Sequence, residues 1–223
     1  MSARFVELSH PIENGTITYP GLPAPVVSDF LSRRDSGRKY AAGTTFHIGR
    51  VEMVANTGTY VDAPSHRFEG RADIGALPLE RLADVPGLVV DAGAEPRAIG
   101  PVRFERFAVA GRAVLVRTGW ARHWGTAAYG EGNPFLTRAT AAWLAKEKAA
   151  LVGIDSLNID DTADLERPAH TLLLEAGIPI LEHLCNLEKL PDSGFRLHAV
   201  PAPLHGMGSF PVRAYAILEP AAR

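Results

Sequence analysis

The stretch 137–155, TRATAAWLAKEKAALVGID, decides the fold class of this 223-residue chain. Thr137 is a residue type that caps helix N-termini. The apolar residues Ala141, Leu144 and Ala145 fall near one face of the helix that follows, which we expect to run to residue 149. Leu151–Asp155 comes directly afterwards and has the aliphatic character of a buried strand. A helix followed at once by a strand is typical of an α/β unit.

Further short elements lie on both sides of this unit. We expect strands at 4–8, 46–55, 87–91, 113–117, 178–181 and 212–218, and helices at 77–82, 168–176 and 182–190. Their order mixes hairpin-like and crossover connections, which predicts a mixed β-sheet with flanking helices. The sequence shows no internal repeat, low-complexity tract or linker, so we predict a single α/β domain over residues 1–223.

Composition excludes several classes of protein. The chain has 23 basic and 25 acidic residues and no Lys/Arg block of about five to eight residues, which argues against a nucleic-acid partner. No apolar run approaches the ~18 residues of a membrane span, so we expect no membrane partner. The single cysteine, Cys185, cannot form an internal disulfide, and a cytoplasmic location is therefore the default expectation.

The segment 56–66, NTGTYVDAPSH, places a carboxylate and an imidazole close together in the sequence, just after an expected strand. Asp62 and His66 are four residues apart, and Pro64 between them makes a continuous helix improbable, so a turn would have to aim both side chains inward. A histidine within reach of a carboxylate can act as a general base. The alternative is a structural Gly/Pro loop in which Asp62 caps a turn.

Three later residues are candidates of the same kind. Asp155 ends a buried strand, where carboxylates often face a cleft, although it could equally cap the next turn. His170 lies near the start of an expected helix, and Glu182 follows a short expected strand. A histidine with carboxylates is a ligand set suited to zinc or manganese. Taken singly, His170 fits a structural histidine and Glu182 a solvated charge at a helix start.

The chain resembles the metal-dependent cyclase family of hydrolases, which includes kynurenine formamidase and isatin hydrolase. The family motif has the form His-x-Gly-Thr-His-x-Asp-x-Pro-x-His, and Gly58-Thr59, Asp62, Pro64 and His66 stand in that register. Further similar segments follow in the family's order; they are Leu8–Pro11, Arg117–Trp120, Gly153–Ser156, His170, Glu182 with Asn186-Leu187, and Pro203–Arg213. The resemblance implies the swivelling β/α/β type of single-domain fold.

The resemblance also implies roles for individual residues, and the chain departs from the family at two of them. The first two histidines of the motif are metal ligands in the family, and here they are Asn56 and Tyr60. An amide oxygen is a poor zinc ligand, and a phenol with a pKa of ~10 must lose its proton to become a good one. The remaining family ligands imply one site for a divalent ion, Mn²⁺ or Zn²⁺, held by Asp62, His170 and Glu182, with His66 as the catalytic acid/base.

Three functions are compatible with this departure. The first is a hydrolase with one metal ion, in which Tyr60 donates a hydrogen bond to the developing oxyanion and Asn56 orients the substrate. The second is a metal-free enzyme that uses Tyr60, Asp62, His66 and Glu182 as acids and bases. The third is a non-catalytic binding protein that has lost the ion. We favour the first because four polar positions of the family site are retained together.

The expected reaction is hydrolysis of the C–N bond of a small amide, an aryl formamide or a cyclic amide. The family places an aromatic residue near the N-terminus against the substrate ring, which assigns Tyr19 to substrate binding, although it could also be a turn residue covering the core. His205 is a candidate replacement ligand, while His47 and His198 have no assigned role. The resemblance alone implies a homodimer or larger homo-oligomer.

Overall fold

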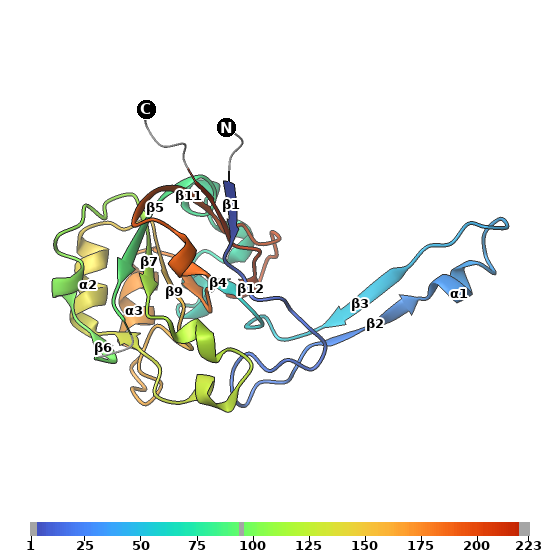
Figure 1. Cartoon of the computed structure of the whole chain (residues 1–223), viewed down its shortest axis with the longest axis horizontal. Helices are drawn as coiled ribbons and strands as arrows, with labels where there is room; N and C mark the ends of the chain where they lie inside the picture. The colour runs from blue at the N-terminus through green and yellow to red at the C-terminus, as the bar shows by residue number, and fades with distance from the viewer. Residues whose placement is uncertain (1–3, 94–95, 219–223) are drawn as a thin grey trace.

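The computed structural model describes residues 4–93 and 96–218 and contains one mixed α/β domain (Figure 1). Its main sheet has nine strands in the order β1-β13-β11-β5-β7-β9-β10-β4-β12. The strands of this sheet are β1 (Arg4–Glu7), β4 (Tyr60–Asp62), β5 (Val85–Asp91), β7 (Ala113–Arg117), β9 (Leu151–Ile154), β10 (Ile180–Glu182), β11 (Ser193–His198), β12 (Ser209–Pro211) and β13 (Tyr215–Leu218). The predicted fold class is confirmed.

The centre of the sheet is parallel and its two sides are antiparallel. Strands β5, β7, β9 and β10 pair in parallel, whereas β11 joins β5, and β4 joins β10, in the antiparallel sense. Parallel strands are covered on both faces, and the continuous apolar run Ala113–Val116 is accordingly buried.

Two helices, α2 (Arg138–Lys146) and α3 (Pro168–Glu175), cover one face of the sheet side by side (Figure 1). Thr137 caps α2 by accepting a hydrogen bond from the backbone N–H of Thr140, as its residue type predicts. Ala141 and Leu144 on α2 and Leu173 on α3 pack there with side chains of the central strands. A second apolar core on the opposite face includes Leu115 and Phe195.

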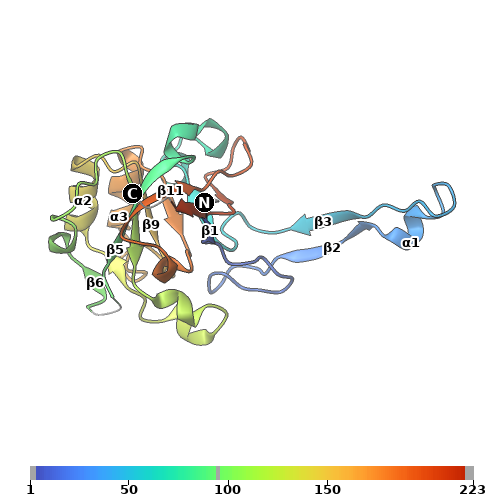
Figure 2. The same cartoon turned by 45° about the horizontal axis from the view of Figure 1, so that its top comes forward.

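A long hairpin projects from the body of the domain, as Figures 1 and 2 both show. Its strands β2 (Val26–Leu31) and β3 (Ile48–Glu52) pair only with each other among the strands described, and the short helix α1 (Arg33–Ser36) lies near its tip. A third, two-stranded sheet is formed by β6 (Ala98–Ile99) and β8 (Phe135–Leu136). The expected strand 46–55 is thus confirmed over its central part.

Several expected elements are corrected. The predicted helix 182–190 is wrong, because Glu182 ends β10 and the left-handed backbone of His183 and Asn186 (φ 57° and 58°) breaks any helix; only the 3₁₀ turn Leu187–Lys189 forms. The helix expected at 77–82 is likewise a single 3₁₀ turn, Leu79–Arg81. The closing strand begins at Tyr215 rather than at residue 212.

The segment 56–66, expected to be a loop, contains the strand β4. Strand β4 lies between β10 and the edge strand β12, so its three residues are completely covered by neighbours. Pro211 in β12 is acceptable because an edge strand need not donate on its outer side. After β4, Pro64 begins a 3₁₀ turn that ends at His66. No continuous helix joins Asp62 to His66, as expected from the proline between them.

Candidate active site

Strand β4 presents two polar side chains on the face that borders a pocket. Residues i and i+2 of a strand share a face, so Tyr60 and Asp62 point the same way while Val61 joins the apolar core. In the register of β4 and β10, Tyr60 lies directly opposite Glu182. The Tyr60 hydroxyl donates to Glu182 Oε2 at 2.6 Å. The phenol's single O–H is therefore committed to holding this carboxylate.

Asp62 is completely buried, and its two oxygens have different surroundings. Oδ1 accepts a short hydrogen bond from the Ser209 hydroxyl. Oδ2 has no hydrogen-bond partner in the described part of the chain and lies 3.7 Å from Nε2 of His170. Burial by itself raises the pKa of Asp62, but the positive charges of His170 and His66, together with the hydrogen bond from Ser209, outweigh it and lower that pKa.

His170 is held by Asp160, a residue that sequence analysis did not identify. Asp160 Oδ2 lies 2.7 Å from Nδ1 of His170, and the same carboxylate accepts the backbone N–H groups of Ala169 and His170 at the start of α3. This arrangement turns Nε2 toward Asp62 and toward Glu182 Oε1, which is 3.8 Å away. Burial lowers the pKa of His170, but the three surrounding carboxylates outweigh it and raise that pKa to about 10.

Glu182 is as deeply buried as its neighbours. Besides the Tyr60 hydroxyl, its carboxylate accepts the backbone N–H of Ile159 at Oε1 (2.8 Å). Burial raises the pKa of Glu182 to about 7, with the charge of Asp62 adding to the effect and His170 opposing it. A nearby positive charge favours the ionised form of a buried carboxylate such as that of Glu182.

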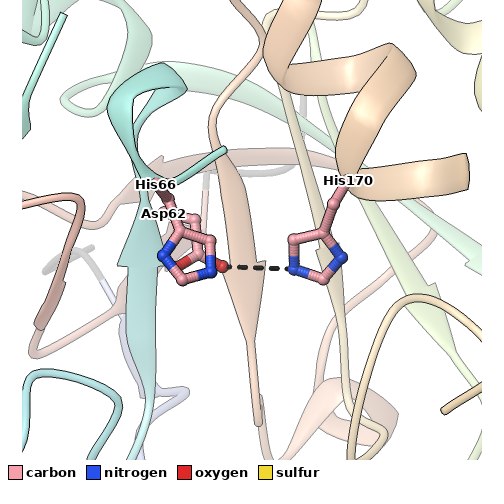
Figure 3. A group of neighbouring side chains, drawn as sticks. All are labelled: Asp62, His66 and His170. Atoms are coloured by element: carbon pink, nitrogen blue, oxygen red, sulfur yellow. Dashed lines mark ion pairs between the residues drawn. The ribbon is translucent and has the colours of Figure 1, made fainter. Parts of the chain in front are cut away.

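His66 and Ser209 complete the group. Figure 3 shows His66 beside Asp62, with His170 facing them. Nδ1 of His66 lies 2.9 Å from Ser209 Oγ. Because Ser209 donates its proton to Asp62, its oxygen accepts from His66, so Nδ1 carries the hydrogen and Nε2 keeps a free lone pair. Gly208 makes the approach possible, since a Cβ there would meet the His66 Cα at 2.6 Å. The His66 side chain remains 36% exposed.

These residues border a pocket of about 310 Å³. Six of the residues singled out from the sequence line it; they are Tyr19, Asn56, Tyr60, His66, His170 and Glu182. Asp62 lies directly behind, in contact with His66 and His170. The structure thus brings all seven predicted site residues together, from positions as far apart in sequence as Tyr19 and Glu182.

The donor set fits one divalent cation. Ligand atoms around a single ion lie about 3 to 4 Å apart, which matches the spacing of His170 Nε2 from Asp62 Oδ2 (3.7 Å) and from Glu182 Oε1 (3.8 Å). The unpartnered oxygen of Asp62 and the His170 ring fixed through Asp160 are the features expected of a ligand and of its supporting carboxylate. Among the described residues, however, the group of three whose ligand atoms all lie within 4.8 Å of one another is Asp62, His66 and His170, and it does not include Glu182. His66 is therefore an alternative third ligand to Glu182.

Other candidates lie elsewhere. His205 does not join the group, because its exposed side chain faces Asp73 at 3.5 Å. His47 pairs with Asp29 across the projecting hairpin, and His198 stacks on Tyr215. Asp155 accepts hydrogen bonds from Thr118 and Gly119 and holds that loop, as the structural alternative predicted.

Sequence analysis missed several residues of the site. Ser209 and Asp160 orient the histidines, while Leu22, Arg67, Asn158 and Arg167 line the pocket. Arg67 follows His66 directly, which could have drawn attention to it. The others are isolated residues whose relevance depends on how distant segments meet.

The fold and the site define a class of protein: a single α/β domain with a buried carboxylate–imidazole group that fits one cation at the floor of a pocket. Residues 6–161 match the model of the Cyclase family ("Putative cyclase"), and the chain belongs to this family. The chain is 28% identical over 214 residues to a kynurenine formamidase of Bacillus cytotoxicus, covering 96% of this chain and 97% of the relative.

Solved structures show the same fold. One is described as a potential metal-dependent hydrolase with cyclase activity and superposes with a TM-score of 0.81 at 25% identity, covering 98% of this chain and 100% of the other. Isatin hydrolase A from Ralstonia solanacearum superposes with a TM-score of 0.81 at 24% identity, covering 97% and 92% of the two chains. The predicted family is thereby confirmed. No helix in residues 4–93 and 96–218 is long and apolar enough to cross a membrane.

Proposed function

We propose that this chain hydrolyses the C–N bond of a small amide, an aryl formamide or a cyclic amide, with one divalent cation, Mn²⁺ or Zn²⁺. The observation that carries the proposal is the chain of contacts from Asp62 through Ser209 to His66 at the edge of a pocket that also contains His170 and Glu182. The similarity to kynurenine formamidase over nearly the whole chain supports the choice of amide hydrolysis.

The proton-transfer step is assigned to His66. Its Nε2 removes a proton from the attacking water, and the hydroxide equivalent adds to the amide carbonyl carbon. The imidazolium then returns the proton to the leaving nitrogen as the C–N bond breaks, giving a carboxylic acid and an amine. The hydrogen bond from Nδ1 to Ser209 keeps the ring in the required tautomer throughout.

The other residues hold and orient. Asp62, His170 and Glu182 would hold the cation, which when bound supplies Lewis-acid polarisation of the carbonyl. One imidazole and two carboxylates suit Mn²⁺ better than Zn²⁺. Tyr60 keeps Glu182 in place. The donation to the developing oxyanion that was predicted for Tyr60 would require its hydroxyl to turn from Glu182 to the substrate. Asn56 and Tyr19 are assigned to the substrate amide and to its ring, respectively.

Turnover assays test this function directly. Protein purified without chelator, supplied with Mn²⁺ or Zn²⁺, is expected to hydrolyse N-formylkynurenine, formanilide or isatin and to contain about one ion per chain. Equal turnover by the metal-free protein would support the metal-free enzyme instead. Absence of turnover together with tight retention of an amide would support the binding protein.

We also propose that copies of this chain associate, with the projecting hairpin as the contact. Val27, Phe30 and Val51 on its two strands are 47–75% exposed. An isolated two-stranded hairpin is marginally stable in water, and a second copy that covers it would remove this apolar surface from water. Sedimentation velocity is expected to show a dimer or larger assembly for the native chain and a monomer for Phe30→Ser. A native monomer would contradict the proposal.

A further inference from the structure

Two arginines at the mouth of the pocket have no assigned role. Arg67 and Arg167 line the same pocket as Tyr60, His170 and Glu182. Neither forms an ion pair with any residue in the described ranges. The nearby carboxylates face other arginines, since Glu166 pairs with Arg138 and the Asp161 carboxylate lies 4.0 Å from Arg97. The Arg167 guanidinium donates from Nη1 to the uncharged backbone carbonyl of Asp161 at 3.4 Å.

Both arginines are attached to the first turn of α3. Nε of Arg67 donates to Thr171 Oγ1 at 3.3 Å, and its guanidinium lies over the Phe68 ring at 5.4 Å. The carbonyl of Arg167 accepts the backbone N–H of Thr171 at 2.9 Å. Thr171 therefore links the two arginines and holds them beside one opening.

The backbone of Arg167 is strained. Its φ of 48° and ψ of 60° are left-handed, a conformation that non-glycine residues rarely adopt because Cβ then approaches the following carbonyl oxygen. Left-handed non-glycine residues gather at functional sites, where the surrounding structure enforces them. Here the enforced conformation places a cationic side chain at the pocket just before the helix that carries His170.

The rim contains no matching negative group. Among the lining residues within the described ranges the only carboxylate is Glu182, which is buried at the floor and engaged by Tyr60 and Ile159. A substrate ammonium group would thus find no partner at the mouth, whereas a substrate carboxylate would find two guanidinium groups, the side chains best suited to bind one.

We propose that Arg67 and Arg167 form a binding subsite for a carboxylate on the substrate, so that the preferred substrates are aryl amides with a net negative charge. This inference rests on the proposed amide hydrolysis. It goes further by separating three substrate types: the anionic amide is preferred over a zwitterionic amino-acid amide, and both over a neutral one.

A comparison of three substrates tests the subsite. The probes are 2-formamidobenzoate (anionic), N-formylkynurenine (zwitterionic) and formanilide (neutral). For the native enzyme with Mn²⁺ we expect kcat/KM to fall in that order. In Arg167→Gln and in Arg67→Gln the preference for 2-formamidobenzoate over formanilide should fall by about 10- to 100-fold, the size of a lost charge-assisted hydrogen bond.

Two further variants sharpen the result. Arg167→Lys keeps the charge but not the two-pronged geometry, and should give an intermediate preference. Arg71→Gln is the matched control, because Arg71 lies over the same Phe68 ring but does not line the pocket, and its preference should equal that of the native enzyme. Equal native kcat/KM for the anionic and neutral probes, or an equal loss on both in the arginine variants, would overturn the subsite.

A binding measurement separates failure of the subsite from failure of the proposed function. If none of the three amides is hydrolysed, amide hydrolysis is wrong, and calorimetric titration with benzoate still tests the arginines. Benzoate is expected to bind the native protein, more weakly at high ionic strength, and about 10-fold or more weakly to Arg167→Gln. Equal benzoate affinity in both proteins would contradict the proposal.

Discussion

The floor and the rim of the pocket differ in how firmly their residues are held. At the floor, Tyr60, Asp62, His170 and Glu182 are at most 7% exposed, and each forms at least one hydrogen bond to a buried partner. At the rim, Arg67 is exposed and Tyr19 and Arg167 are half-buried. Charged groups fixed away from water at the floor are arranged for one type of reaction. Partly exposed side chains at the rim can be substituted with little loss of folding stability.

The same segments supply both regions. Asp62 ends β4, and the turn that follows carries His66 and Arg67. The start of α3 carries Arg167 three residues before His170. The residues proposed for the reaction and those proposed for substrate selection therefore lie on the same two backbone segments. Variants at the two regions should therefore differ in kind as well as in size.

The largest effect is expected at the floor, for Asp62→Asn. Removing the charge of the Asp62 carboxylate should abolish cation retention and lower kcat/KM by about 10⁴-fold or more, because the Lewis acid supplies several kcal/mol. Elemental analysis and steady-state kinetics measure both. Asp155→Asn is the control: this buried carboxylate should affect stability and leave the cation content unchanged. Full cation retention in Asp62→Asn would contradict the assignment of Asp62 as a ligand of the cation.

Between floor and rim, His66→Ala should lower kcat by about 10²- to 10⁴-fold, the usual contribution of a general base. Cation content should be unchanged, and thermal unfolding should confirm an intact fold. Loss of the ion in His66→Ala would instead make His66 a ligand, in agreement with the compact group of Asp62, His66 and His170.

The third prediction concerns how the stability of the fold depends on pH through His183, which lies behind Tyr60. His183 packs beside the Tyr60 ring (5.2 Å between centroids), and burial lowers its pKa from 6.5 to about 3. A depressed histidine pKa contributes stability that is complete above pH 6.5 and is lost as the pH falls toward 3. Asparagine tolerates the left-handed backbone at this position.

Urea unfolding of the native chain and of His183→Asn at pH 7 and pH 4.5 measures this effect. Between these pH values the native chain should lose about 2 to 3 kcal/mol more unfolding free energy than the variant, since the unfolded histidine gains a proton and the folded one does not. Identical losses would show that His183 becomes protonated without unfolding.

The smallest effect is expected at the rim, for Tyr19→Ala. Loss of a stacking ring should raise KM for an aryl amide by about 3- to 10-fold and leave kcat unchanged, with Tyr19→Phe close to native. Steady-state kinetics on formanilide provide the measurement. A fall in kcat without a change in KM would place Tyr19 in the chemical step.

Secondary structure was predictable where the sequence pattern is local. Thr137 and the apolar face of 137–149 identified α2, and aliphatic runs identified β5, β7 and β9. Strand β4 was missed because its three residues have no recognisable alternation and become a strand only between β10 and β12. The erroneous helix at 182–190 has a related cause, since the left-handed residues His183 and Asn186 form hydrogen bonds with Thr59 and Glu7, which are distant in sequence.

The sequence by itself determined the family and the α/β class, because motif residues and their order survive at low identity. It also predicted seven site residues, which the structure places in or directly behind one pocket. Only the tertiary structure decided how they are used. It directed the Tyr60 hydroxyl to Glu182, placed Ser209 between Asp62 and His66, turned His170 through Asp160 and left Arg67 and Arg167 at the mouth. Hydrogen bonds between residues more than a hundred positions apart depend on strand order and register, which local sequence does not encode.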